Sequence, residues 1–151
     1  MHYQNGIAEF VKLAQKMNTD LVKKVQFPKF SDDRGSLVFG EGKRHIPFDI
    51  QRIYFLYDIR NNMERGAHAH RELEQVLIAV SGKFRLTLDN GSTKSSVWLS
   101  DPSEGIYVGK MVWHVLDNFT EDAVCLSLAS HAFCEDDYIR NYQEFVSVQR
   151  R

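Results

Sequence analysis

The sequence predicts an all-β domain, a sandwich or a barrel, with a helix at each end of the chain. From Leu21 onward the chain consists of short β-rich runs separated by Gly, Pro, Asn and Asp. The segment Asp89-Asn90-Gly91 lies between two alternating runs and predicts a tight hairpin, because Asn and Gly tolerate positive φ angles. Helical spacing of apolar residues appears only near the two ends of the chain.

The predicted strands follow one another with turn residues between them, a pattern that does not fit alternating strands and helices. A second turn is expected at residues 101–105, where Pro102 fixes one dihedral angle and Gly105 frees another. The expected strands are Leu21–Phe27, Leu37–Phe39, Ile50–Ile59, Ala67–His70, Gln75–Val80, Phe84–Leu88, Ser96–Leu99, Ile106–Val108, Met111–Leu116 and Ala123–Ala129.

Two amphipathic segments predict the terminal helices. Apolar residues recur at intervals of three and four between Ile7 and Met17, and Asn5 is available as a cap. The same spacing recurs between Asp136 and Val148, where Asp136 or Asp137 can cap the amino end. We therefore expect residues 1–20 to form a helical extension and residues 21–151 to form one domain.

Composition narrows the class of partner. The 151 residues are 43% hydrophobic and 26% charged, and the formal net charge is -1. This charge provides no basic field for nucleic acid, so the expected partner is a small molecule. The polar start Met1-His-Tyr-Gln-Asn5 does not resemble a signal peptide, and no apolar run is long enough for a bilayer. We expect no membrane partner and a cytoplasmic location.

The residues that point to chemistry lie in Arg65-Gly-Ala-His-Ala-His-Arg-Glu-Leu-Glu-Gln75. On an extended strand His68 and His70 point to the same side, so two imidazoles share one small volume. Each titrates near neutrality, which suits the pair either to bind a metal ion or to transfer protons.

The metal interpretation has a candidate ligand set. Glu74 follows the pair, and His114 follows Gly109 in Gly109-Lys-Met-Val-Trp-His114. Histidines and a carboxylate on facing strands are typical ligands of Zn, Fe, Mn or Ni. Spacing alone leaves both the metal site and the proton-transfer site open.

A series of short motifs resembles the dTDP-4-keto-6-deoxyhexose 3,4-ketoisomerases, which are cupin-fold enzymes of deoxyamino-sugar biosynthesis. The resemblance extends from about Phe27 to about Phe145. The motifs are, in order, Asp33-Arg-Gly-Ser-Leu37, Ile46-Pro-Phe48, Arg52-Ile-Tyr54, Arg65-Gly-Ala-His-Ala-His70, Leu73-Glu-Gln-Val-Leu77, Tyr107-Val-Gly109, Trp113-His114 and Asp137-Tyr-Ile-Arg140.

The resemblance implies a cupin, or jelly-roll, fold and an isomerase that moves a ketone from C4 to C3 without a cofactor or metal. It implies that His68 and His70 perform acid–base chemistry, one abstracting the C3 proton and the other relaying protons. The second cupin motif usually has proline before its glycine, whereas Val108 precedes Gly109 here. This departure disfavours a standard metal-binding cupin.

Further residues are expected at the substrate. Arg65 and Tyr54 are candidates for stabilising the enediolate, and Arg34 is the candidate for the diphosphate because guanidinium groups bind two oxygens at once. Weaker or additional candidates for the substrate are Arg85, Lys94, Trp113 and His114.

The resemblance also implies a dTDP-linked 4-keto-6-deoxyhexose as substrate and a homodimer with an exchanged N-terminal strand. Such an exchange would cover an open sheet edge and would bring Arg34 to the partner's pocket. Two alternatives remain at this stage. One is a metal-dependent cupin enzyme that uses His68, His70, Glu74 and His114, and the other is a non-catalytic module that binds a sugar nucleotide.

Overall fold

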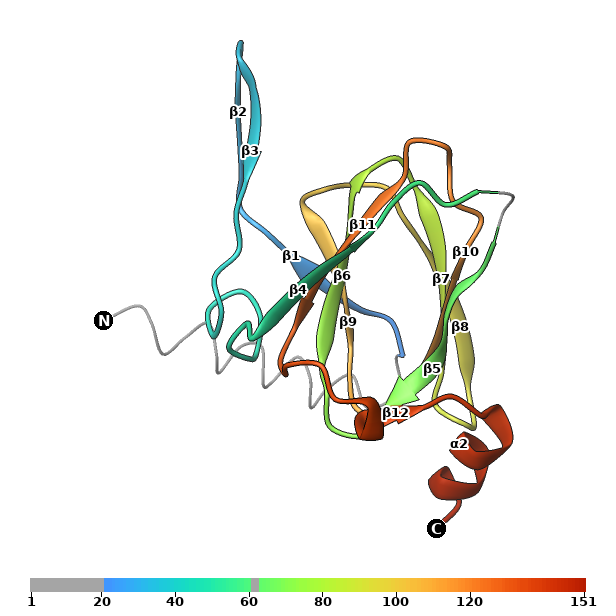
Figure 1. Cartoon of the computed structure of the whole chain (residues 1–151). Coiled ribbons are helices and arrows are strands. Elements are labelled where there is room, and N and C mark those ends of the chain that lie inside the picture. The colour runs from blue at the N-terminus through green and yellow to red at the C-terminus, as the bar shows by residue number, and fades with distance from the viewer. Residues whose placement is uncertain (1–20, 61–62) are drawn as a thin grey trace.

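Two antiparallel sheets face each other in the computed structural model, which describes residues 21–60 and 63–151 (Figure 1). The predicted N-terminal helix lies outside these residues. The first sheet contains, in spatial order, β1 (Lys23–Gln26), β9 (Glu104–Val108), β6 (Gln75–Ser81), β11 (Val124–Ala129) and β4 (Arg52–Leu56). The second contains β12 (Tyr138–Ile139), β5 (Arg65–His70), β10 (Trp113–Asp117), β7 (Phe84–Asp89) and β8 (Lys94–Leu99). The predicted all-β, jelly-roll architecture is confirmed.

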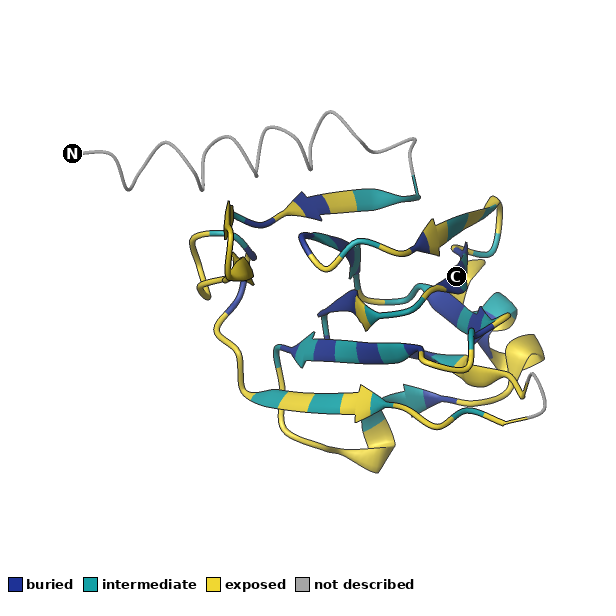
Figure 2. Ribbon diagram, turned by 90° about the horizontal axis from the view of Figure 1, so that it is seen from above, coloured by how far each residue is buried: buried dark blue, intermediate teal, exposed yellow. Residues whose placement is uncertain are grey.

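The main core fills the space between the two sheets. Alternate residues of β7, among them Phe84, Leu86 and Leu88, are fully buried there against β6 residues such as Leu77. The opposite side of β6 is also covered, because Val76 and Ile78 pack against a second cluster that includes Phe27, Ile46 and Phe48. Figure 2 shows the resulting alternation of buried and less buried residues along the strands. Burial on both faces explains the nearly continuous apolar sequence of β6.

The Asn90-Gly91 hairpin joins β7 and β8 as predicted. Asp89 pairs with Lys94, so four residues form the connection, and Gly91 adopts a φ of 88°. Asp89 accepts a hydrogen bond of 2.7 Å from the backbone N–H of Gly91, which stabilises the turn.

A two-stranded hairpin of β2 (Lys29–Asp32) and β3 (Gly35–Val38) projects from the body of the domain (Figure 1). Strand β3 overlaps a predicted strand, but β2 does not, because β2 has two charged residues among four and no apolar alternation. Its register pairs Phe30 with Leu37, and both side chains are exposed.

The C-terminal segment contains the predicted helix, but the helix begins later than expected. A short 3₁₀ helix η1 (Glu135–Asp137) and strand β12 come first, and helix α2 (Tyr142–Gln149) follows. Asn141 caps α2 by accepting a hydrogen bond of 3.0 Å from the N–H of Glu144. The expected cap residue Asp137 has a different task, described below. No helix in the described part of the chain is long and apolar enough to cross a membrane.

Candidate active site

Three imidazoles meet between the two sheets. His68 and His70 come from β5 and His114 from the adjacent strand β10, where it pairs directly with His68. The ring centroid of His68 lies 4.9 Å from that of His70 and 4.5 Å from that of His114. His70 and His114 are only 3% and 1% exposed. The predicted side-by-side arrangement of the two β5 histidines is therefore present.

An irregularity in β5 sets this arrangement. Gly66 has a φ of 82° and Ala67 a φ of 56°, and the register with β10 shifts between His114 and Val115. A Cβ atom on Gly66 would lie 2.9 Å from the carbonyl oxygen of His114. Glycine is thus required both by the positive φ and by the close approach of β10.

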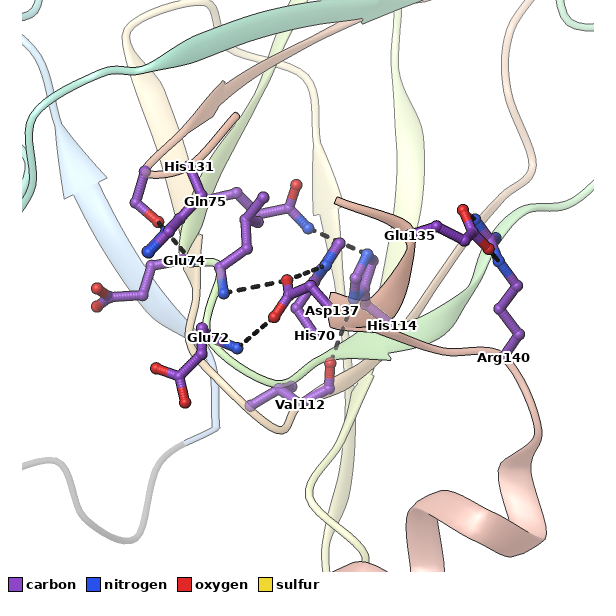
Figure 3. A network of polar contacts seen from close by, with 12 residues as sticks. His70, Glu72, Glu74, Gln75, Val112, His114, His131, Glu135, Asp137 and Arg140 are labelled. Carbon is purple, nitrogen blue, oxygen red and sulfur yellow. Dashed lines mark hydrogen bonds and ion pairs between the residues drawn. The ribbon is translucent and has the colours of Figure 1, made fainter. Parts of the chain in front are cut away.

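His70 forms a pair with Asp137. The Nδ1 atom of His70 lies 3.0 Å from Oδ2 of Asp137, whose other oxygen accepts a 2.7 Å hydrogen bond from the N–H of Glu72 (Figure 3). Because a carboxylate only accepts, Nδ1 of His70 carries the proton and Nε2 is the basic nitrogen. The carboxylate of Asp137 thereby fixes both the tautomer and the orientation of His70.

His70 and Asp137 both have shifted pKa values. Burial lowers the pKa of His70, and Asp137 opposes part of this shift. Burial alone would raise the pKa of Asp137, but hydrogen bonds from Glu72, Leu73 and His70 outweigh it and hold the pKa below its usual value. The pair therefore consists of an ionised carboxylate and a neutral imidazole at neutral pH.

His68 has a different environment. Burial, with a smaller contribution from His70, lowers the pKa of His68 to about 4, and a hydrogen bond with the backbone of Gly66 opposes this shift. No carboxylate among residues 21–60 and 63–151 forms an ion pair with it. His68 is therefore a neutral imidazole near pH 7, able to accept a proton but without a counterion.

His114 belongs to a buried chain of hydrogen bonds. Its Nδ1 lies 3.2 Å from the carbonyl oxygen of Val112, which only accepts, so Nδ1 carries the proton and Nε2 is an acceptor. Nε2 in turn lies 3.1 Å from the amide nitrogen of Gln75, which donates to it. The amide oxygen of Gln75 accepts from Tyr54 at 2.7 Å and from Ser127 at 3.0 Å. Burial keeps the pKa of His114 well below its ordinary value.

The four residues of the alternative metal interpretation, His68, His70, Glu74 and His114, do not all come together. One nitrogen from each of His68, His70 and His114 lies within 4.8 Å of the others. However, both ring nitrogens of His114 are engaged, with Val112 and Gln75. Glu74 points away from the histidines (Figure 3), and its carboxylate accepts a short hydrogen bond from Tyr107. Glu74 therefore does not complete the four-ligand set of that alternative, and the carboxylate that supports the histidine pair is Asp137.

The other predicted substrate-binding residues lie in different parts of the structure. Tyr54 lies on the inner face of β4 beside the cluster, but its hydroxyl hydrogen is donated to Gln75. Arg65 is exposed at the start of β5. Arg34 is exposed at the tip of the β2–β3 hairpin, where it pairs with Asp32.

Three predicted residues point to the outer face of the second sheet. Trp113 packs against Tyr142 and Phe145 of α2, with ring centroids 5.2 and 5.6 Å apart. Arg85 forms a two-pronged ion pair with Asp117, at 2.8 and 2.7 Å. Arg85, Lys94 and Trp113 line one hollow on that face, separate from the histidines. Strand alternation places them there, because their neighbours Leu86 and His114 face inward.

Two residues that lie at the cluster are not among the predicted site residues. Asp137 is predicted as a possible helix cap and belongs to the motif Asp137-Tyr-Ile-Arg140, but its carboxylate contacts His70 instead. Tyr138 follows it and packs against both β5 histidines, with ring centroids 4.9 Å from His68 and 4.4 Å from His70. The only sequence signal for either residue is membership of that motif. Strand β12 is two residues long and therefore too short to show an alternating pattern.

Comparison with known proteins supports one family. The family model described as FdtA: WxcM-like, C-terminal, matches residues 20–150. The TDP-4-oxo-6-deoxy-alpha-D-glucose-3,4-oxoisomerase of Aneurinibacillus thermoaerophilus is 44% identical over 123 residues, 82% of this chain and 88% of the relative.

Solved structures similar to this chain belong to the same class of enzyme. QdtA, a sugar 3,4-ketoisomerase from Thermoanaerobacterium thermosaccharolyticum in complex with TDP, superposes with a TM-score of 0.84 at 38% identity, over 87% of this chain and 96% of that one. A 3,4-ketoisomerase from Helicobacter canadensis gives a TM-score of 0.83 at 42% identity, over 86% and 98% of the two chains. The jelly-roll fold and the histidine pair between the two sheets agree with these relatives, and the chain belongs to the sugar 3,4-ketoisomerase family.

Proposed function

We propose that this protein converts a dTDP-4-keto-6-deoxyhexose into the corresponding 3-keto sugar by proton transfer at His68 and His70. The observation that carries the proposal is the pair of neutral imidazoles, one of them held by Asp137. The complex of QdtA with TDP, and another of the same enzyme with TDP-4-keto-6-deoxyglucose, support the substrate class. A charged sugar nucleotide of this class is consistent with a cytoplasmic location.

The chemistry needs two proton carriers. The C4 ketone acidifies the proton on C3, and an imidazole removes it while the carbonyl oxygen takes up a proton, which gives an enediol. A proton is then delivered to C4, and the C3 hydroxyl loses its proton as the new ketone forms. All electrons stay in the sugar, so the reaction needs no redox partner.

Each histidine suits part of this cycle. A neutral imidazole is an efficient base near pH 7 and typically contributes about 10²–10⁴-fold to such a transfer. Asp137 stabilises the imidazolium that forms when Nε2 of His70 takes a proton, whereas no carboxylate of residues 21–60 and 63–151 forms an ion pair with His68. One histidine exchanges protons with carbon and the other relays protons among the oxygens.

The direct test is incubation with dTDP-4-keto-6-deoxyglucose in D₂O, followed by NMR. Deuterium at the reacting carbons indicates an enediol, and the coupling constants of the product give the configuration at C4. Substituting His68→Asn or His70→Asn should nearly abolish turnover while TDP still binds. Binding of TDP without any turnover by the wild type would instead indicate a non-catalytic sugar-nucleotide module.

We also propose a homodimer in which the β2–β3 hairpin of each protomer covers the partner. Phe30 and Leu37 on the hairpin are 63% and 58% exposed, and Ile53 and Phe55 on β4 are 55% and 56% exposed. Apolar patches of this kind are typical of protein interfaces. A groove of about 650 Å³ lies where the hairpin base meets the outer face of the first sheet.

The same arrangement gives Arg34 a function. Within its own protomer Arg34 lies at the tip of a hairpin that projects from the body (Figure 1), and its side chain is 89% exposed. Exchange of the hairpin would carry this guanidinium to the partner, where it can bind the diphosphate.

A further inference from the structure

Arg52 is an inward-facing cation beside the histidine cluster. Its register partner on β11 is Ala129, which pairs with Gln75 on β6, so Arg52 and Gln75 lie in one row across the sheet. Ala129 and Gln75 are fully buried. Alternation along β4 therefore directs Arg52 and Tyr54 into the space between the sheets, while Ile53 and Phe55 face outward.

Two aromatic rings hold the guanidinium. The Cζ atom of Arg52 lies 5.5 Å from the ring centre of Tyr54 and 5.7 Å from that of Phe133. Cation–π contacts of this kind orient the group without using its N–H donors. The donors of Arg52 therefore stay available for another partner.

That partner is missing among the described residues. Arg34, Arg71, Arg85 and Arg140 each form an ion pair with a carboxylate. In contrast, Arg52 forms no ion pair with any residue in 21–60 or 63–151, and its Nε atom is buried without a hydrogen bond. A buried N–H donor without a partner is costly for a folded protein, and the positive charge of the guanidinium points to an anion supplied from outside.

Arg52 lies close to the proposed reacting groups. It is close enough to lower the pKa of His70, as a contribution smaller than burial. Tyr54, over which Arg52 lies, donates its hydroxyl hydrogen to Gln75 and so has none left for an oxyanion. Arg52 is therefore the charged donor with free N–H groups on this wall of the site.

The geometry points to Arg52 as a substrate-binding residue that donates to a negatively charged oxygen of the sugar nucleotide. This inference rests on the proposed function. Two oxygens share the required chemistry, the enediolate oxygen that forms during the reaction and a diphosphate oxygen present throughout.

The test compares Arg52→Gln with Arg52→Lys and with the control Arg60→Gln. Arg60 is exposed, and within the described part of the chain its ion pair is with Asp58, at 2.9 Å. Each variant is assayed for kcat and KM with dTDP-4-keto-6-deoxyglucose, for TDP affinity by calorimetry, and for its thermal midpoint. For Arg52→Gln we expect a loss of kcat/KM of about 10²-fold or more, as for removal of one oxyanion donor. Its thermal midpoint should be unchanged or higher, because a buried N–H donor without a partner is removed.

The remaining measurements distinguish the enediolate oxygen from the diphosphate oxygen, and they distinguish a failure of this inference from a failure of the proposed function. A lower kcat with unchanged TDP affinity assigns Arg52 to the enediolate, and a parallel loss of TDP affinity assigns it to the diphosphate. Arg52→Lys keeps the charge and should recover part of the activity. Arg52→Gln with activity and TDP affinity within threefold of the wild type would overturn the inference, as would a loss explained by an equally lowered thermal midpoint. An inactive wild type would instead overturn the proposed function.

Discussion

The carboxylate of Asp137 lies 3.0 Å from Nδ1 of His70, although 67 residues separate them in the chain. The contact joins β5 to the end of η1, and β12 then continues it by pairing Tyr138 with His70. The same carboxylate accepts hydrogen bonds from the N–H groups of Glu72 and Leu73. Asp137 is thus a positioning residue that orients His70 and the turn after it.

Replacing Asp137 by Asn should lower kcat by roughly 10²-fold, the lower end of the range typical of acid–base catalysis. The amide oxygen can still accept from Nδ1, but the negative charge that stabilises the imidazolium is lost. Because Asp137 opposes the lowering of the pKa of His70, its removal should also move the acid limb of kcat/KM to lower pH. Rate profiles against pH measure both effects, with the exposed neighbour Asp136→Asn as control. An unchanged acid limb would contradict this role.

The buried histidines should make the fold sensitive to acid. The pKa of His68 is lowered from 6.5 to about 4, and those of His70 and His114 are lowered as well. Below the unfolded value of about 6.5 the unfolded chain binds protons that the folded chain does not, so stability is lost as the pH falls from about 6.5 towards 4. Urea unfolding between pH 7.5 and 4.5 measures this slope. His68→Gln should flatten it, and an equal slope in that variant would refute the assignment.

Gln75→Leu should destabilise the protein by about 2–4 kcal/mol, because it leaves Nε2 of His114 and the hydroxyls of Tyr54 and Ser127 without their partner. The matched control is Gln51→Leu, since Gln51 is exposed. Chemical denaturation with both variants gives the difference. A cost similar to that of the control would show that the buried chain contributes little.

Gly66→Ala should lower both stability and activity, since a Cβ atom would lie 2.9 Å from the carbonyl oxygen of His114 and the φ is 82°. Gly91→Ala is a well-matched control, because its φ is 88° but its Cβ would meet only the flexible side chain of Gln149, at 3.2 Å. Backbone strain of about 1–2 kcal/mol is common to both variants. The additional loss in Gly66→Ala, measured by thermal unfolding and turnover, isolates the contact between β5 and β10. Equal losses would mean that this contact is unimportant.

The double substitution Phe30→Ser, Leu37→Ser should convert the proposed dimer to a monomer, because it removes the apolar side chains of the projecting hairpin. Sedimentation at micromolar concentration measures the change, with Tyr57→Ser, another exposed apolar position, as the control. A wild type that sediments only as a monomer would disprove the exchanged dimer.

The parts of the fold with regular apolar alternation could be predicted from the sequence. Strands β6, β7 and β11 lie close to their predicted bounds. Each has one or two faces buried in a core, and this burial gives a regular apolar pattern in the sequence. Strands β2 and β12 were not expected. The first is exposed along its whole length, and the second is too short for any pattern.

The sequence by itself determined that His68 and His70 lie on one side of a strand, because strand geometry is local, and its motifs indicated the family. Only the tertiary structure decided which distant groups meet them. In the folded chain Asp137, and not Glu74, is the carboxylate that contacts the histidine pair. Both ring nitrogens of His114 form hydrogen bonds. The tertiary structure also turned Arg52 inward, while the apolar residues Ile53 and Phe55 of the same strand are exposed. These outcomes depend on strand register and on loop closure across dozens of residues, which local sequence patterns do not encode.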